Sequence, residues 1–198
     1  MQFIIDHITG VVIAAIVVMI IAVTQFRSSE SSIGAAQYAA AKTRMLDVAQ
    51  YVEQDFTNIG SGVDTVANAI QSFDTVSAVK HFQFLGRIDI ADPTVHTIRY
   101  QWEETGSAIV QGNTVPAYTV ERRIDGTVSG TSPPTITDFR IDLMTGDSVA
   151  VTSANFPDTR IVAVWVTSVS PLGPNKTLEQ TRWRKIFRPV NMTRTFFP

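Results

Sequence analysis

The sequence predicts an α+β protein in which an N-terminal transmembrane helix continues into an amphipathic helix that packs on an antiparallel β-sheet. Three observations support this prediction. The 198-residue chain opens with a long apolar run, continues with apolar residues at helical spacing, and changes after residue 73 to a two-residue alternation of apolar and polar side chains. We therefore divide it into a transmembrane anchor (1–27), an amphipathic helical stalk (28–73) and an antiparallel β-rich domain (74–198).

The anchor is the apolar run. Residues 11–23 (VVIAAIVVMIIAV) are uninterrupted apolar residues, and between Phe3 and Phe26 the only titratable side chains are Asp6 and His7. As a helix, residues 3–26 would span about 36 Å, enough to cross a hydrocarbon core of about 30 Å. A cleaved secretory signal would need basic residues near its start, and residues 1–10 contain no Lys or Arg. A buried core helix is disfavoured because the run is apolar on every face. We expect a single pass through a lipid bilayer.

The stalk carries one apolar face. Apolar residues recur at spacings of three and four, which is typical of an amphipathic helix: Met45, Ala49, Val52, Phe56 and Ile59. Glycine readily adopts the left-handed conformation that closes a helix, so Gly60-Ser61-Gly62 should end it. Residues 64–73 are expected to add a further turn or two. The helix–sheet contact is predicted at Val52, Asp55, Phe56, Ile59 and Gly60.

The remainder is predicted to form strands. Apolar and polar residues alternate in 96–102 and 138–143, as in half-buried antiparallel strands. Residues 160–169 are apolar on both faces through Val166, which favours a central strand under the long helix, and 180–187 form a last strand. Turns are expected at 104–106, 125–126, 133–134 and 145–147, and residues 129–135 should form an exposed loop.

Composition narrows the chemistry. The charge of −2 excludes a nucleic-acid binder that works by bulk electrostatics, and the absence of cysteine excludes a disulfide framework or a cysteine nucleophile. His7, His81 and His96 lack an acidic or histidine partner at ligand spacing and are interpreted as structural. No catalytic or phosphate-binding motif is present. We therefore expect no enzyme activity, cofactor, metal, small-molecule substrate or nucleic-acid partner.

One basic–aromatic cluster stands out near the C-terminus. Arg182, Arg184, Lys185 and Arg188 surround Trp183 and Phe187. Such charges could meet phosphates, but on an edge strand they more often prevent aggregation between strands.

Several short segments resemble a known family in their order along the chain. They are 52–60 (VEQDFTNIG), 118–123 (YTVERR) followed by Gly126, 136–139 (ITDF) and 189–192 (PVNM). Together with the apolar and amphipathic helices, they resemble type IV pilins and type II secretion pseudopilins, and in detail J-type pseudopilins and W-type minor pilins. The resemblance implies a membrane-anchored structural subunit of a pilus, pseudopilus or related envelope complex, with other pilin-like subunits as partners.

The resemblance also assigns anchor residues. Asp6 occupies the place of the carboxylate that, in this family, pairs with the N-terminal amine of a neighbouring subunit. No basic leader precedes the apolar run, and a cut after Gly10 would put Ala15 where the family has glutamate. Phe3, Asp6, Gly10 and Phe26 are the candidate anchor and assembly residues.

Orientation and setting have competing interpretations. The first basic residue after the run is Arg27, and none precedes it, so the positive-inside rule places the β-rich domain in the cytoplasm. The resemblance places it outside the cytoplasm, in the periplasm or at the cell surface, and we favour that expectation. The alternative function is a single-pass structural subunit of a large membrane complex or membrane-containing virion that is not processed as a pilin. A membrane-tethered enzyme or ligand-binding module is a third alternative.

Overall fold

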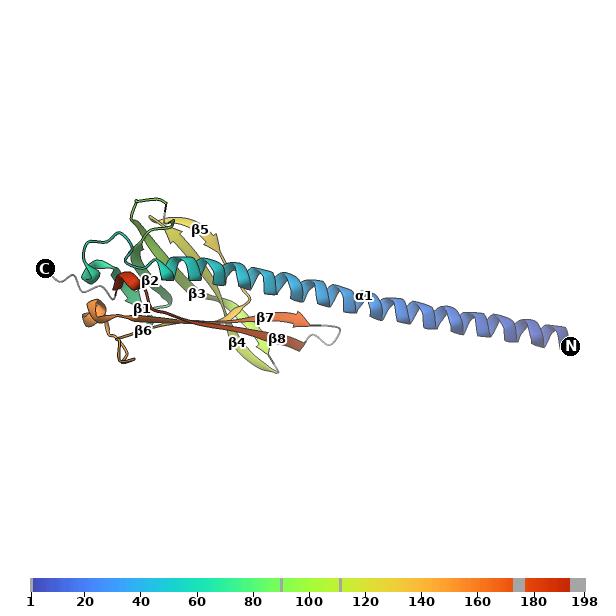
Figure 1. Cartoon of the computed structure of the whole chain (residues 1–198). Helices are drawn as coiled ribbons and strands as arrows, with labels where there is room; N and C mark the ends of the chain where they lie inside the picture. Colours follow the sequence, from blue (N-terminus) through green and yellow to red (C-terminus); the bar gives the residue numbers. More distant parts are fainter. Residues whose placement is uncertain (1, 90, 111, 173–176, 193–198) are drawn as a thin grey trace.

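A computed structural model describes residues 2–89, 91–110, 112–172 and 177–192. One long helix, α1 (Gln2–Thr57), carries an eight-stranded antiparallel sheet at its C-terminal end (Figure 1). The predicted α+β architecture is therefore confirmed. The strands are β1 (Ile70–Asp74), β2 (Val79–Gly86), β3 (His96–Val110), β4 (Asn113–Ile124), β5 (Thr127–Thr131), β6 (Ile136–Met144), β7 (Ile161–Leu172) and β8 (Thr177–Phe187). They lie in the order β1-β2-β3-β4-β6-β7-β8, and β5 pairs with β4.

Helix α1 joins the predicted anchor and stalk without a break. Its 56 residues contain no proline, and the segment between Thr24 and Ser32 contains no glycine either, so nothing there interrupts the backbone hydrogen bonds. The N-terminal half extends beyond the sheet, whereas the C-terminal part lies along β7 and β8 (Figure 1). One continuous element therefore connects the apolar run to the folded domain.

The helix ends where the sequence indicates, but the next segment differs from expectation. Gly60 has a φ of +74°, the left-handed conformation that glycine adopts without strain. Residues 64–73 do not add helical turns of α1: they form a 3-10 turn (Val66–Asn68) and the first strand, β1, from Ile70. Pairing with β2 satisfies the backbone groups of β1, and this long-range contact overrides the local helical pattern.

The predicted strands are present, with two local corrections. Glu104 to Gly106, expected to be a turn, is a register shift inside the 15-residue strand β3, because glycine and polar residues suit a bulge as well as a turn. Residues 129–135, expected as an exposed loop, include the end of β5, and Ser132 is buried with its hydroxyl oxygen accepting a bond from the Val120 N–H. Asp125 and Gly126, both with positive φ, form the predicted hairpin turn.

The core lies between α1 and the sheet. Strand β7 is an interior strand between β6 and β8, and among the strands it makes the most extensive contact with α1. Its valines at 162, 164 and 166 are at most 1% exposed. On the other face, Ile161 and Ala163 are also buried, whereas Trp165 is partly exposed, so the continuous apolar character of 160–169 reflects burial on both faces in the first half of β7. Strand β7 lies next to the edge of the sheet rather than at its centre.

Candidate functional site: the anchoring helix and its junction with the sheet

The apolar half of α1 has no cover within the described chain. Its large apolar side chains from Ile8 to Phe26 are each between 44% and 69% exposed. A contiguous apolar surface of this size is unfavourable in water and marks a membrane or protein contact. Among the described residues, α1 is the one helix that is long and apolar enough to cross a membrane. The predicted anchor therefore has the length, composition and exposure of a membrane span.

The four candidate anchor residues all lie on α1, but they are not equally described. Phe3 and Asp6 are on its first turns, and their side chains lie outside the described part of the structure. Phe26 is 66% exposed. Gly10 has no heavy atom within 4 Å of the position a Cβ would take, so no packing within the described chain requires glycine there.

At the other end of α1, Phe56 is the centre of an aromatic cluster. Its ring is fully buried and meets four other rings edge to face, with centroids 5.3–5.5 Å away: those of Phe82, Phe84, Tyr100 and Phe187. These rings come from β2, β3 and β8, so one helical side chain joins strands that are distant in the sheet order. Val52 and Ile59 beside it are also fully buried. The three apolar contact residues predicted from the sequence lie together in the core.

Next to Phe56, Asp55 anchors a buried polar cluster. Its carboxylate is 0% exposed and accepts a hydrogen bond from the Tyr100 hydroxyl at 2.6 Å. Arg122 on β4 donates two more, from Nε at 2.6 Å and Nη2 at 2.7 Å. The Arg122 Nη1 donates to the Ser129 hydroxyl at 2.8 Å. This two-pronged pair ties the last turn of α1 to β4 with defined geometry.

The electrostatics of this cluster favour one protonation state. Burial, followed by the charge of Asp55, raises the pKa of Tyr100 well above its ordinary value, so Tyr100 stays a neutral donor. The hydrogen bonds that Arg122 donates to Asp55 raise the pKa of Arg122, which stays protonated. A fixed ion pair with a neutral phenol positions structural elements rather than transferring protons.

The helix–sheet junction also brings the backbones close together. The Gly60 N–H donates to the Leu85 carbonyl at 2.8 Å, and Ile59 forms a bridge with Gly86. A Cβ at Gly86 would lie 2.6 Å from the Asn58 carbonyl oxygen, so only glycine permits this approach. Gly60, predicted as a contact residue from its place in the sequence, therefore follows the end of α1 and is hydrogen-bonded to β2.

A groove of about 520 Å³ opens beside the buried ion pair, between α1 and the β4–β5 side of the sheet. Its walls include Arg44, Tyr51, Arg122 and Ser132. The Arg122 guanidinium lies 5.4 Å from the centroid of the Tyr51 ring, which covers it from the solvent side.

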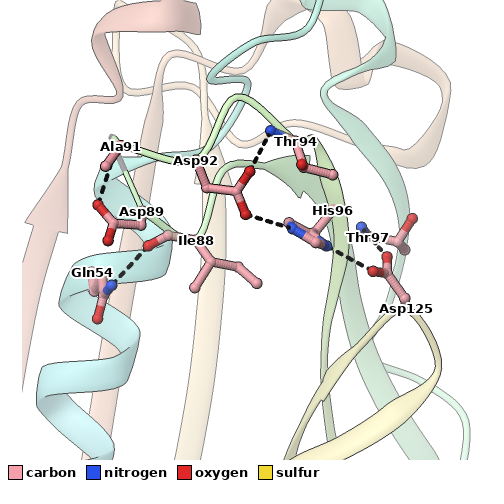
Figure 2. A network of polar contacts seen from close by, with 9 residues as sticks. All are labelled: Gln54, Ile88, Asp89, Ala91, Asp92, Thr94, His96, Thr97 and Asp125. Carbon is pink, nitrogen blue, oxygen red and sulfur yellow. Dashed lines mark hydrogen bonds and ion pairs between the residues drawn. The ribbon is translucent and has the colours of Figure 1, made fainter.

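The sequence analysis was wrong that His96 lacks an acidic partner. Figure 2 shows its ring between two carboxylates: Nδ1 lies 2.7 Å from Asp125 and Nε2 lies 3.8 Å from Asp92. The hydrogen bond with Asp125 is the main cause of the raised pKa of His96. Each carboxylate also accepts a backbone N–H, from Thr94 or Thr97. Among the described residues, no group of three His, Cys, Asp or Glu side chains could hold a metal ion.

The chain fold explains which partners the sequence did not reveal. Asp92 lies four residues before His96 and is a visible signal, whereas Asp125 is brought to His96 only by the pairing of β3 with β4. The partners of Asp55, Tyr100 and Arg122, are 45 and 67 residues away, and the sequence analysis did not link either of them to Asp55.

Comparison of the chain with known protein families, curated proteins and solved structures found no match. The likeness to pilins therefore concerns general shape: a long, N-terminally apolar helix followed by an antiparallel sheet.

Proposed function

We propose that this protein is a pilin-like structural subunit, anchored in a membrane by the N-terminal half of α1 and assembled through that half with other pilin-like or membrane-complex subunits. The observation that carries the proposal is one continuous helix with two different environments. Its first half exposes apolar side chains on all faces, and its second half is fixed in the core by Phe56 and Asp55. Such a helix transmits the position of a membrane contact directly to the domain.

Asp6 is proposed as the specific assembly contact of the anchor. A carboxylate within an apolar membrane helix is costly unless it is paired, which makes it a functional candidate by itself. The family resemblance supplies the partner, the N-terminal amine of a neighbouring subunit. We propose a pilus, pseudopilus or related envelope complex as the assembly, with residues 28–198 on the extracytoplasmic side.

The proposal is tested by crosslinking in native membranes. Because the chain has no cysteine, a single cysteine at the exposed position Ile16 reports neighbours by oxidative crosslinking. We expect Asp6→Ala to remove the crosslinked species without changing the folded domain, and His7→Ala, a matched change at the adjacent polar residue, to preserve them. Unchanged crosslinking in Asp6→Ala would contradict the assembly role.

Two further measurements separate the remaining interpretations. N-terminal sequencing of native protein distinguishes a trimmed, methylated chain, as in filament assembly, from a chain that retains Met1, as in a fixed subunit of a membrane complex or virion. Orientation is read from Val76→Cys, since Val76 is 93% exposed. A membrane-impermeant maleimide added to intact cells or spheroplasts should label this cysteine. Labelling only after the membrane is opened would place the domain in the cytoplasm.

A further inference from the structure

The described sheet has one long, regular edge. Strand β8 ends the strand order, and its pairing with β7 runs without a register shift from Val162 opposite Phe187 to Leu172 opposite Thr177. The opposite edge, β1, has five residues and contains a register shift, and the short strand β5 also has one. Bulges and short strands protect an edge from added strands. Strand β8 lacks both, so its outward N–H and C=O groups form an unbroken row, and its protection against added strands comes from charged side chains.

The basic–aromatic cluster of the sequence divides between the two faces of β8. Lys185 points to the helix side, where its ammonium lies 2.8 Å from the Glu53 carboxylate, and Phe187 is in the core. Because successive side chains alternate, Arg182, Arg184 and Ile186 project from the opposite face. All three are exposed. The cluster therefore gives the outer face of β8 a positive charge, carried by Arg182 and Arg184.

The arginines on this outer face are held in place, and within the described chain neither Arg182 nor Arg184 forms an ion pair, although the charge of Arg182 acts on the nearby Asp138 carboxylate. The Arg184 guanidinium lies 5.0 Å from the centroid of the Trp165 ring, and Arg140 on β6 lies 5.3 Å from the same centroid. Arg182 donates to the Gln180 side chain at 3.1 Å. Arg140 is paired with Asp142, but among the described residues neither Arg182 nor Arg184 has a carboxylate within 4 Å. Stacking uses the guanidinium face and leaves N–H edges available to an acceptor.

Charge makes this edge selective. A second copy of β8 added beside the first would place its arginines near those already there, and like charges on adjacent strands are destabilising. A basic strand is excluded for the same reason. An acidic strand instead forms opposite-charge pairs in addition to the backbone hydrogen bonds. A groove of about 520 Å³, which also contains Asp138, lies on the β7 side of Arg182 and Arg184 and keeps this side of both arginines open.

We propose that β8 is the docking site for an extended acidic segment of a partner protein, which adds a strand to the sheet and places Asp or Glu side chains beside Arg182 and Arg184. Backbone hydrogen bonds along β8 provide affinity, and the two arginines determine which strand is accepted. This site is distinct from the membrane anchor, and its test does not depend on how the anchor assembles.

The test uses the full chain in nanodiscs of zwitterionic lipid and a fluorescent, capped peptide of about eight alternating Glu and Val residues, an ordinary strand length. We expect saturable binding, at least tenfold tighter than that of a Lys/Val peptide of the same length. Two further Glu/Val peptides carry N-methyl groups on alternate backbone amides, in the two possible phases. Methylation should abolish binding in the phase whose N–H groups face β8 and have little effect in the other.

Charge reversal supplies the matched comparison. Arg182→Glu with Arg184→Glu should reverse the preference, so that the Lys/Val peptide binds at least tenfold tighter than the Glu/Val peptide. Lys42→Glu with Arg44→Glu changes the net charge equally on exposed positions of α1 and should leave the preference unchanged. Circular dichroism checks that each variant is folded. If the charge-reversed variant does not fold, Arg182→Gln with Arg184→Gln takes its place and should bind the Glu/Val and Lys/Val peptides equally.

Four outcomes would overturn the proposal. They are no binding of the Glu/Val peptide, equal binding of the methylated peptides in both phases, an unchanged preference after charge reversal, and displacement of the peptide by added copies of the protein itself. Equal binding in both phases would indicate side-chain attraction without strand addition. Displacement by the protein would assign the edge to self-association.

Discussion

Replacing Asp55 with alanine should be one of the most damaging single changes in the folded domain. The carboxylate is 0% exposed and accepts three hydrogen bonds, one from Tyr100 and two from Arg122. Without it, the Arg122 guanidinium, in a residue 8% exposed, keeps only its described bond to Ser129. Removing one partner of a buried ion pair costs about 3–5 kcal/mol, because the other charge remains desolvated. That loss is a large share of the roughly 5–15 kcal/mol by which domains are stable.

The assay is guanidinium chloride unfolding of the full chain in detergent, followed by tryptophan fluorescence, since Trp102 in the core is 2% exposed. The matched control is Arg123→Ala, on the same strand and paired with Glu121 at 2.8 Å in a partly exposed position. This control should lose less than about 1 kcal/mol. Replacing the whole cluster, with Asp55→Leu, Arg122→Met and Tyr100→Phe, should recover most of the stability. An Asp55→Ala variant no less stable than Arg123→Ala would refute the reasoning.

The remaining stability predictions concern separate features. Phe56→Ala should cost about 3–5 kcal/mol because it empties the centre of four ring contacts, and a loss under about 1 kcal/mol in the same assay would contradict that placement. The raised pKa of His96 means that its contribution to the free energy of unfolding is complete below pH 6.5 and is lost as the pH rises through the folded pKa. Burial and Arg99 lower the pKa of His81, so the contribution of His81 to stability is complete above pH 6.5 and is lost as the pH falls. The stability differences of His96→Asn and His81→Asn from the native chain should then have opposite pH slopes, and parallel slopes would exclude this assignment. Deletion of residues 1–27 should give a soluble fragment that circular dichroism and gel filtration show to be folded, whereas an insoluble or unfolded fragment would mean that anchor and domain are not separable.

The sequence predicted best where spacing alone carries the information. Val52 and Phe56 lie on one helical face wherever the sheet is placed, and the two-residue alternation in 96–102 determines which side chains of β3 face inward. Ile59, predicted on the same helical face, is buried beside them but follows the end of α1 and bridges to Gly86. Local composition was less decisive at turns. Glu104-Thr105-Gly106 fits both a turn and a bulge, and the choice between them depends on whether β4 continues to pair beyond it, which it does. The sequence analysis missed the part of β5 within the expected loop for the same reason, because local composition does not show that these residues pair with β4.

Pairing between distant segments was the least accessible feature. The pattern places Asp55 beside the buried face of the helix but does not show that Tyr100 and Arg122 will satisfy it. Arg122 is preceded by Glu121 and followed by Arg123, and only the alternation of β4 separates the buried arginine from its partly exposed neighbours. Likewise, Lys185 and Arg184 look equivalent in the sequence, yet they lie on opposite faces of β8, and within the described chain only Lys185 has an acidic partner. These distinctions require the register of the sheet.

The buried ion pair has a geometric role that stability alone does not reveal. Contacts of the Phe56 ring are strong but weakly directional, so they resist separation of α1 from the sheet more than rotation of α1 about its axis. The two bonds between Asp55 and Arg122 are directional, and we expect them to fix that rotation, and with it the face that the anchor presents 30 to 50 residues away. The measurement is the spin-label distance distribution between Ile33→Cys on α1 and Val76→Cys in the sheet domain, both exposed positions of a cysteine-free chain. In the variant with Asp55→Leu, Arg122→Met and Tyr100→Phe, the distance distribution should broaden although stability is largely retained. A distribution as narrow as that of the native pair would show that apolar packing alone sets the rotation.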